Sequence, residues 1–343
     1  MKFLVYLMIL IICICIAPPG YESDFNWLLH FNEGPDLSWL PTAYRGTWTN
    51  LTILFGGDSQ ANGAAQEPTV IYEGNPQILT NYINVFKMWW RGNWNSPYTI
   101  NYAESANGIN WTQYSGNPLI TGDYAQPDVF HFGNTYYLYL ETDSGLELCR
   151  FHSSNGINWV YDGIVLTTGT WDNSLANAWI QYNSAKDWSM IYDGMDRETS
   201  TYVWMEGYAT STDGGMTWTK HSGNPVIGFS GVWFGKYDGT YYFWGQYTAG
   251  YPVYSDWGFN SNVTTCCILP TDIGCATSKN LIYWNLNPKN PVVTRNMVGH
   301  QYDNNDGQVA DPCLLETQGK IWMYFDAEPN QTTGYIGCVS MLE

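Results

Sequence analysis

The chain has 343 residues, of which 31 are acidic and 13 are Lys or Arg, so its formal net charge is −18 at pH 7. A surface this negative repels phosphate backbones and anionic lipid headgroups, which argues against nucleic-acid and membrane-surface partners. The 18 Trp and 27 Tyr residues supply large side chains for an extensive core.

Residues 1–20 have the pattern of a secretory signal peptide. Lys2 precedes an apolar run from Phe3 to Ala17, and Pro18-Pro19-Gly20 follows that run. About fifteen apolar residues are too few for a typical membrane span of about twenty. We therefore expect a secreted, extracellular chain whose residues 21–343 form one domain, with a short uncleaved anchor as the alternative.

Six cysteines remain after the signal peptide: Cys149, Cys266, Cys267, Cys275, Cys313 and Cys338. An even number of cysteines in a secreted chain permits disulfides. Cys275 is an expected partner for one of the vicinal residues Cys266 and Cys267. Cys313 and Cys338 are a second candidate pair, because they fall on neighbouring predicted strands. No Cys or His spacing predicts zinc, and no cofactor is expected to be required.

A pattern of strand, Asn-Gly turn, Trp and Gly-Asn-Pro exit first occurs at residues 103–120 and returns three times. The repeated tryptophans, Trp111, Trp159, Trp218 and Trp284, lie 48, 59 and 66 residues apart. That spacing is typical of a four-stranded propeller blade with variable loops. We interpret these tryptophans as residues that pack one blade against the next.

The predicted strands follow in chain order. Residues 51–55 form a short apolar strand that we expect to join the C-terminal repeat and close a ring. Five repeats then begin near residues 67, 127, 178, 231 and 310, and residues 247–272 form an inserted loop. The sequence predicts an all-β, five-bladed β-propeller with four-stranded antiparallel blades. A two-sheet sandwich is the alternative, but it does not account for five copies of one pattern.

The first strand of each propeller blade lines the central channel, so residues at its start converge on one place. Alignment of the five first strands puts Glu67, Asp128 and Asp311 at one level, whereas residues 177–178 and Gly231 are not acidic. Paired carboxylates are what cleavage of a glycosidic bond requires, one as an acid and one as a base or nucleophile. A third carboxylate nearby raises the pKa of the acid.

A second set of polar residues directly follows the second strands: Arg91, Glu141, Asp193, Gln246 and Asp326. With Asp58 and the aromatic residues Trp90, Trp179 and Trp233, they are candidates for binding the hydroxyl groups and faces of a sugar. The alternative is structural: an acid before Pro can simply end a turn, and a polar residue after a strand can simply be solvated.

Three segments carry a family resemblance: Glu67-Pro68-Thr69-Val70, Gln126-Pro127-Asp128-Val129-Phe130 and Ala310-Asp311-Pro312. With blade ends such as residues 105–111 and 115–119, they resemble the five-bladed propeller glycoside hydrolases. That group includes arabinanases, arabinofuranosidases, β-xylosidases, invertase-like enzymes and mannoside phosphorylases. The resemblance extends from residue 58 to the C-terminus.

The resemblance implies a base or nucleophile Asp, a second Asp that orients the substrate, and a Glu acid, all at first-strand entrances. Asp128 and Asp311 match the Asp-type motifs, Glu67 stands where Asp is common, and no clear Glu-Gly-Pro acid motif occurs between residue 58 and the C-terminus. Some members bind calcium in the channel, and nothing in this sequence establishes such a site.

Two functions follow as expectations. The first is a secreted glycoside hydrolase acting on a polysaccharide or oligosaccharide, with Glu67, Asp128 and Asp311 as catalytic carboxylates. The second is a non-catalytic carbohydrate-binding or surface propeller.

Overall fold

The computed structural model describes residues 49–58, 64–73, 85–93, 97–142, 144–195, 204–227, 230–237, 239–247, 272–287, 290–293, 308–330 and 333–342. The predicted signal peptide and the cysteines at 266 and 267 lie outside these residues. Within the described ranges, no helix has the length and hydropathy needed to cross a membrane.

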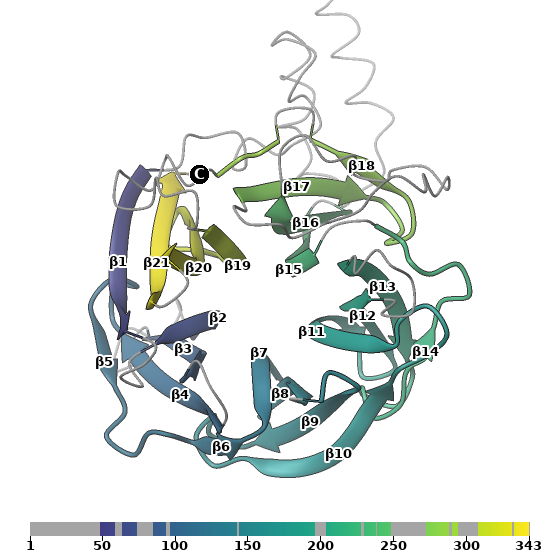
Figure 1. Ribbon diagram of the computed structural model, residues 1–343, viewed down its shortest axis with the longest axis horizontal. Coiled ribbons are helices and arrows are strands. Elements are labelled where there is room, and N and C mark those ends of the chain that lie inside the picture. The colour runs from purple at the N-terminus through teal and green to yellow at the C-terminus, as the bar shows by residue number, and fades with distance from the viewer. Residues whose placement is uncertain are drawn as a thin grey trace, which may run out of the picture. The chain divides into compact units, whose positions relative to one another are not determined.

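Five antiparallel sheets are arranged around a central channel (Figure 1). Blade 1 contains β2 (Ala65–Glu73), β3 (Val85–Gly92), β4 (Tyr98–Ser105) and β5 (Trp111–Gln113), with β6 (Ile120–Gly122) also paired to β4. Blade 2 contains β7 (Tyr124–Phe132), β8 (Thr135–Thr142), β9 (Glu147–Ser153) and β10 (Val160–Thr167). Blade 3 contains β11 (Ser174–Ser184), β12 (Asp187–Met195), β13 (Trp204–Ser211) and β14 (Thr219–Lys220). The predicted five-bladed β-propeller is confirmed, although the described part of blade 1 has a fifth strand.

Blades 4 and 5 complete the ring. Blade 4 contains β15 (Ser230–Tyr237), β16 (Thr240–Tyr247), β17 (Asp272–Ser278) and β18 (Trp284–Leu286). Blade 5 contains β19 (Gln308–Thr317), β20 (Lys320–Asn330), β21 (Thr333–Leu342) and β1 (Thr49–Asp58). The first and last strands of the fold therefore pair in one sheet, with Thr52 opposite Cys338 and Asp58 opposite Thr333. The expected closure is confirmed, and it removes the open sheet edges that an unclosed ring would leave.

Each repeated turn is held by side-chain to backbone hydrogen bonds. Ser105 Oγ accepts from the backbone N–H groups of Asn107 and Gly108, at 3.2 and 2.9 Å. Asn107 Oδ1 accepts from the next two N–H groups, those of Ile109 and Asn110, at 3.0 and 2.8 Å. The equivalent residues of the other three turns are Ser153 and Asn155, Ser211 and Asp213, and Ser278 and Asn280. The repeat requires Ser and Asn or Asp at this spacing because their short side chains satisfy turn N–H groups.

Three of the repeated tryptophans pack on the preceding blade. The ring centroid of Trp159 lies 6.4 Å from that of Trp89, whose Nε1 donates to the carbonyl of Gly156 at 2.8 Å. The corresponding ring pairs are Trp111 with Tyr324 and Trp218 with Tyr139, and these tyrosines donate to Gly108 and Gly215. The interpretation as blade-packing residues is confirmed for Trp111, Trp159 and Trp218, whereas the ring of Trp284 contacts Phe243 of its own blade.

The Gly-Asn-Pro exits complete the third strands. Asn117 Oδ1 accepts from the N–H of Tyr102 and its Nδ2 donates to the carbonyl of the same residue, both at 2.9 Å. Asn224 makes the same two contacts with Tyr208, and Asn290 makes them with Cys275. A side-chain amide thus takes the place of a paired strand residue.

The predicted disulfides are wrong for the described cysteines. Cys149, Cys275, Cys313 and Cys338 are free, buried thiols. Cys313 and Cys338 both lie opposite Tyr324, on the two strands that flank β20. Two strand spacings make roughly 9 to 10 Å, which exceeds the Cα separation that a disulfide can bridge. Burial raises the pKa of Cys275 and of Cys313 to about 12, so both stay protonated near neutral pH.

Substitution of a turn glycine tests the close contact between blades. Gly156 has φ +73°, and a Cβ there would lie 2.8 Å from the ring of Trp89. Gly133 has φ +66°, but a Cβ there would meet nothing within 4 Å. We expect Gly156→Ala to lower the free energy of unfolding by about 3 kcal/mol and Gly133→Ala by only about 1 kcal/mol. Urea unfolding measures both, and equal losses would show that the contact with Trp89 is unimportant.

The turn acid Asp213 predicts a pH effect on stability. Desolvation would raise its pKa, but hydrogen bonds from Thr217, Ser211 and Met216 outweigh it and lower the pKa to about 2. The unfolded value is about 3.9, so Asp213 contributes stability above about pH 4 and loses that contribution as the pH falls toward 2. We expect the stability advantage of wild type over Asp213→Asn to shrink over that range in urea titrations. An advantage that does not change with pH would contradict this assignment.

Candidate functional site

A backbone bulge stands at the start of each inner strand. In four blades it holds a residue other than glycine with positive φ, namely Glu67 at 54°, Gln126 at 53°, Asn177 at 32° and Asp311 at 46°. In blade 4 the register shift falls at Gly231. These five positions are equivalent around the ring and define its mouth.

Asp128 does not lie at that level, contrary to the sequence alignment. Gln126 takes the place equivalent to Glu67 and Asp311, and Asp128 pairs with Tyr139 on β8 after the bulge. Its equivalents are Thr69 on β2, Trp179 on β11, Trp233 on β15 and Cys313 on β19, one step deeper in the channel. Alignment on the Pro that follows Glu67, Gln126 and Asp311 would have revealed this from the sequence.

Hydrogen bonds connect the mouth residues from blade to blade. Asp326 Oδ1 accepts from the N–H of Glu67, and Glu67 Oε2 accepts from the N–H of Gln126 at 2.7 Å. Gln126 Oε1 then accepts from the N–H of Asn177 at 2.6 Å. The bulges of blades 1 and 2 thus turn Glu67 and Gln126 toward the next blade, so these two residues both join blades and line the mouth.

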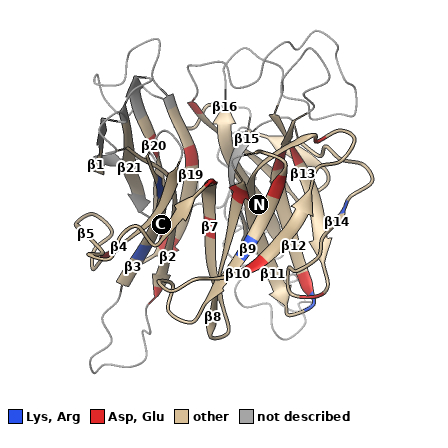
Figure 2. Ribbon diagram, turned by 60° about the horizontal axis from the view of Figure 1, so that its bottom comes forward, with Lys and Arg blue, Asp and Glu red and all other residues tan. Residues whose placement is uncertain are grey.

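One buried cation lies among the mouth carboxylates. Arg91 Nη2 lies 2.9 Å from Glu67 Oε1 and donates to Gln66 Oε1 at 2.7 Å. Burial acts to lower the pKa of Arg91, but the charges of Glu67, Asp326 and Asp311 outweigh it and raise the pKa. Burial raises the pKa of Glu67, and Arg91 offsets only part of that rise. Figure 2 shows acidic positions, in red, on several strands around the channel and few basic positions, in blue.

The polar residues that end the second strands lie at one level, as the sequence pattern indicated. Each pairs with the residue directly before a bulge: Arg91 with Gln66, Glu141 with Ala125, Asp193 with Ala176, Gln246 with Ser230 and Asp326 with Ala310. Asp193 also accepts from Asn177 Nδ2 at 3.1 Å, and Gln246 Nε2 donates to Asp311 Oδ1 at 3.4 Å. The mouth therefore has two concentric sets of polar residues.

The remaining predicted residues lie elsewhere. Trp90 faces blade 5, where its ring packs on Phe55 with centroids 4.7 Å apart. Asp58 ends β1 opposite Thr333, and Trp233 lies opposite Trp244 on the neighbouring strand.

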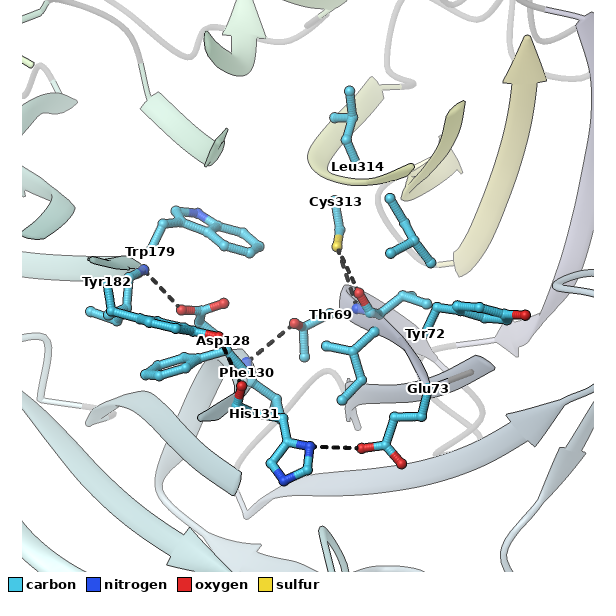
Figure 3. A pocket seen from close by; sticks show the side chains of 15 residues that line it. Thr69, Tyr72, Glu73, Asp128, Phe130, His131, Trp179, Tyr182, Cys313 and Leu314 are labelled. Carbon is cyan, nitrogen blue, oxygen red and sulfur yellow. Dashed lines mark hydrogen bonds and ion pairs between the residues drawn. The ribbon is translucent and has the colours of Figure 1, made fainter. Parts of the chain in front are cut away.

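A cavity of about 440 Å³ occupies the channel below the mouth level (Figure 3). Asp128 and Trp179 project toward the same space, with Thr69 and Cys313 on other inner strands. Asp128 Oδ2 accepts from the N–H of Ile180 at 3.1 Å. Burial raises the pKa of Asp128 well above its usual range, and that hydrogen bond offsets only part of the rise. Asp128 therefore keeps its proton to higher pH than an exposed carboxyl does, and in its protonated form it can donate a hydrogen bond into the cavity.

Sequence reasoning missed Glu206 on β13. It is 0% exposed and lies opposite Asp193, so two carboxyl groups are buried side by side near the mouth. The equivalent residues in the other blades are Ile100, Leu148, Ile273 and Ile336. Alignment of the third strands would have shown an acid where four blades place an aliphatic residue.

The expectation that no cofactor is required stays a prediction. In the described ranges, no group of three or more His, Cys, Asp or Glu side chains is arranged to hold a metal ion.

No protein-family model matches the chain, and no curated protein matches its sequence. Solved structures do share its fold. A thermostable family-43 glycoside hydrolase aligns with a TM-score of 0.56 at 12% identity, covering 80% of this chain and 88% of that one. The α-L-arabinofuranosidase of Podospora anserina, in complex with cellotriose, aligns with a TM-score of 0.57 at 12% identity, covering 86% and 96%. The Cellvibrio cellulosa α-L-arabinanase, complexed with arabinohexaose, aligns with a TM-score of 0.51 at 14% identity, covering 80% and 91%. The predicted resemblance in fold to these propeller hydrolases is confirmed.

Asp128→Asn tests whether burial keeps the channel carboxyl protonated. Because the folded pKa of Asp128 is raised, the native state keeps a proton that the unfolded chain releases above about pH 4. Wild type should therefore lose stability relative to Asp128→Asn as the pH rises, by up to about 1.4 kcal/mol per pH unit. Urea unfolding between pH 4 and 8 measures this, and Asp213→Asn provides a control in which the pKa shift has the opposite sign. A difference that is flat across this range would mean that Asp128 is ionised in the fold.

Proposed function

We propose that the chain is a glycoside hydrolase that cleaves a glycosidic bond of a polysaccharide or oligosaccharide at the channel mouth around Arg91. The observation that carries this proposal is the gathering of Glu67, Asp311 and Asp326 about one buried guanidinium. Three carboxyl groups around one cation favour a state in which one keeps its proton and another stays ionised. Hydrolysis of a glycosidic bond requires that combination.

The mouth residues suit different steps of this reaction. Glu67 is the candidate acid, because burial raises its pKa while Arg91 and the N–H of Gln126 hold its carboxyl in place. Asp311, which is partly exposed, is the candidate base or nucleophile. Asp326 is a positioning residue, because it accepts from the backbone N–H of Glu67.

Asp128 has a separate role in this proposal. It lies one step below the mouth, where the protonated form that burial favours can donate a hydrogen bond to a sugar hydroxyl. Trp179 lines the same cavity and offers an aromatic surface for the C–H face of a sugar ring. We expect these two residues to affect substrate binding more than turnover.

The solved structures of similar fold support a carbohydrate substrate. Their ligands include cellotriose and arabinohexaose, both neutral oligosaccharides. The signal-like residues 1–20 support action outside the cell on such a polymer.

A non-catalytic carbohydrate-binding propeller is the second candidate. The observation that favours it is the presence of Asn177 and Gly231 at the mouth positions of blades 3 and 4, where a further acid would complete a catalytic set. This candidate predicts binding of glycans without release of reducing sugar.

A panel of chromogenic arabinofuranosides, xylosides, galactosides, fructosides and mannosides, with a reducing-sugar assay on polysaccharides, tests the proposal. We expect Glu67→Gln and Asp311→Asn each to lower kcat by about 10²- to 10⁴-fold, the range for loss of an acid or base. Asp128→Asn should mainly raise KM. Urea unfolding checks that each variant is folded.

Full turnover in both Glu67→Gln and Asp311→Asn would overturn the site assignment. No turnover by wild type on any substrate, with glycan binding retained, would favour the carbohydrate-binding propeller instead.

A further inference from the structure

A second cavity, of about 510 Å³, lies between β1 of blade 5 and the outer strands of blade 1. Ala65 and Gly92 line its inner end, and they are the chain neighbours of Gln66 and Arg91 at the mouth. The cavity continues along β4 past Thr99 and Asn101 to Gln113 on β5. It therefore leads away from the mouth toward the outside of the ring.

The lining of this cavity is neutral, although the chain has a net charge of −18. None of its described lining residues is Asp, Glu, Lys or Arg. Its polar groups are the hydroxyl of Thr99 and the amides of Asn93, Asn101, Gln113 and Asn117. Trp90 and Phe55, which pack on each other, supply its aromatic part. A charged ligand would find no counter-ion on these residues, whereas hydroxyl groups would find amide partners.

Asn101 departs from the pattern of the repeat. It lies opposite Trp90, and the equivalent residues are Cys149, Gly207, Gly274 and Gly337. In blades 3 and 5, a Cβ at the glycine would lie 2.3 Å from the ring of Tyr192 and 2.7 Å from that of Phe325. Aromatic side chains thus occupy this space in those blades. Packing within the ring does not require an amide at this position.

The neighbours of Asn101 make room for its amide and orient it. Its Nδ2 donates to Thr99 Oγ1 at 3.0 Å. A Cβ at Gly92 would lie 2.4 Å from that Nδ2 and 2.6 Å from Thr99 Oγ1, so only glycine fits beside this pair. Asn101 Oδ1 and the exposed amide of Gln113 make no hydrogen bond to the described part of the chain. Both can therefore bond to the hydroxyl groups of a ligand.

We propose that this cavity binds a neutral oligosaccharide segment and holds the part of a polysaccharide chain that extends beyond the mouth. The amides of Asn101 and Gln113 bond to its hydroxyl groups, and Phe55, held by the buried Trp90, contacts its C–H surface. That the bound polymer is also the substrate rests on the proposed function. Binding of the polymer to this cavity is measured independently of hydrolysis.

Native gel electrophoresis through soluble xylan, arabinan or mixed-linkage glucan tests the proposal. Asn101→Gly introduces the residue that three other blades have at this place, so the ring should still fold, and urea unfolding checks this. We expect Asn101→Gly to bind about tenfold more weakly to the polysaccharide that retards the wild type. A tenfold loss corresponds to one or two lost hydrogen bonds. Gln113→Ala should weaken binding similarly. Asn158→Gly, at an exposed amide on blade 2, is the matched control and should bind as wild type does.

If the wild type cleaves a polymer, Asn101→Gly should raise the KM for that polymer. The increase should be about ten times the increase in KM for a chromogenic glycoside with a single sugar. The inference would be overturned if Asn101→Gly were retarded as strongly as wild type in every polymer. It would also be overturned if no polymer retarded the wild type. Loss of retardation in this variant when wild type cleaves nothing would support the binding site while contradicting the proposed hydrolase.

Discussion

Pairing between β1 and β21 is the constraint on which the rest of the described structure depends. Each blade of a ring buries both faces against neighbours, so a ring that is not closed leaves two blades with an exposed face and unpaired edges. Here the strand at residues 49–58 supplies the outer strand of the last blade. The channel and its mouth exist because this pairing holds blade 5 beside blade 1, and Arg91 of blade 1 then lies near Asp311 and Asp326 of blade 5.

The bulge at the start of each inner strand couples assembly of the ring to the chemistry of the mouth. In blades 1 and 2 the residue with positive φ, Glu67 or Gln126, turns its side chain toward the next blade, where its oxygen accepts a backbone hydrogen bond. A carboxylate at such a place is buried and partly desolvated, which raises the pKa of Glu67. The same geometry that joins blades therefore also creates a perturbed acid, and perturbed acids are typical of catalytic sites.

Departures from the repeat are the clearest signals of function in this fold. Positions that several blades share, such as the turn Ser105 and the exit Asn117, make backbone hydrogen bonds that complete those blades. Asn101 and Glu206 instead place polar groups where other blades have glycine, cysteine or aliphatic residues. Packing alone does not require them, so they point to ligands or chemistry. Asn101 is neutral and faces the neutral cavity, whereas Glu206 is an acidic residue and adjoins Asp193.

The amino-acid sequence by itself determined the five blades, the closing strand and the role of the repeated tryptophans. The blades and their tryptophans depend on local patterns, since turn residues, strand alternation and repeat spacing act within about seventy residues. The closing strand follows instead from the need of a ring to pair its two ends. The sequence also predicted the level shared by Arg91, Glu141 and Asp326, because each directly follows a buried strand of similar length.

Only the tertiary structure decided the free state of Cys313 and Cys338 and the cavity beside Asn101. The two cysteines are separated by β20, which the spacing of cysteines along the chain does not reveal. The cavity forms between the first strand of the chain and a blade that follows it, so it exists only once the ring has closed.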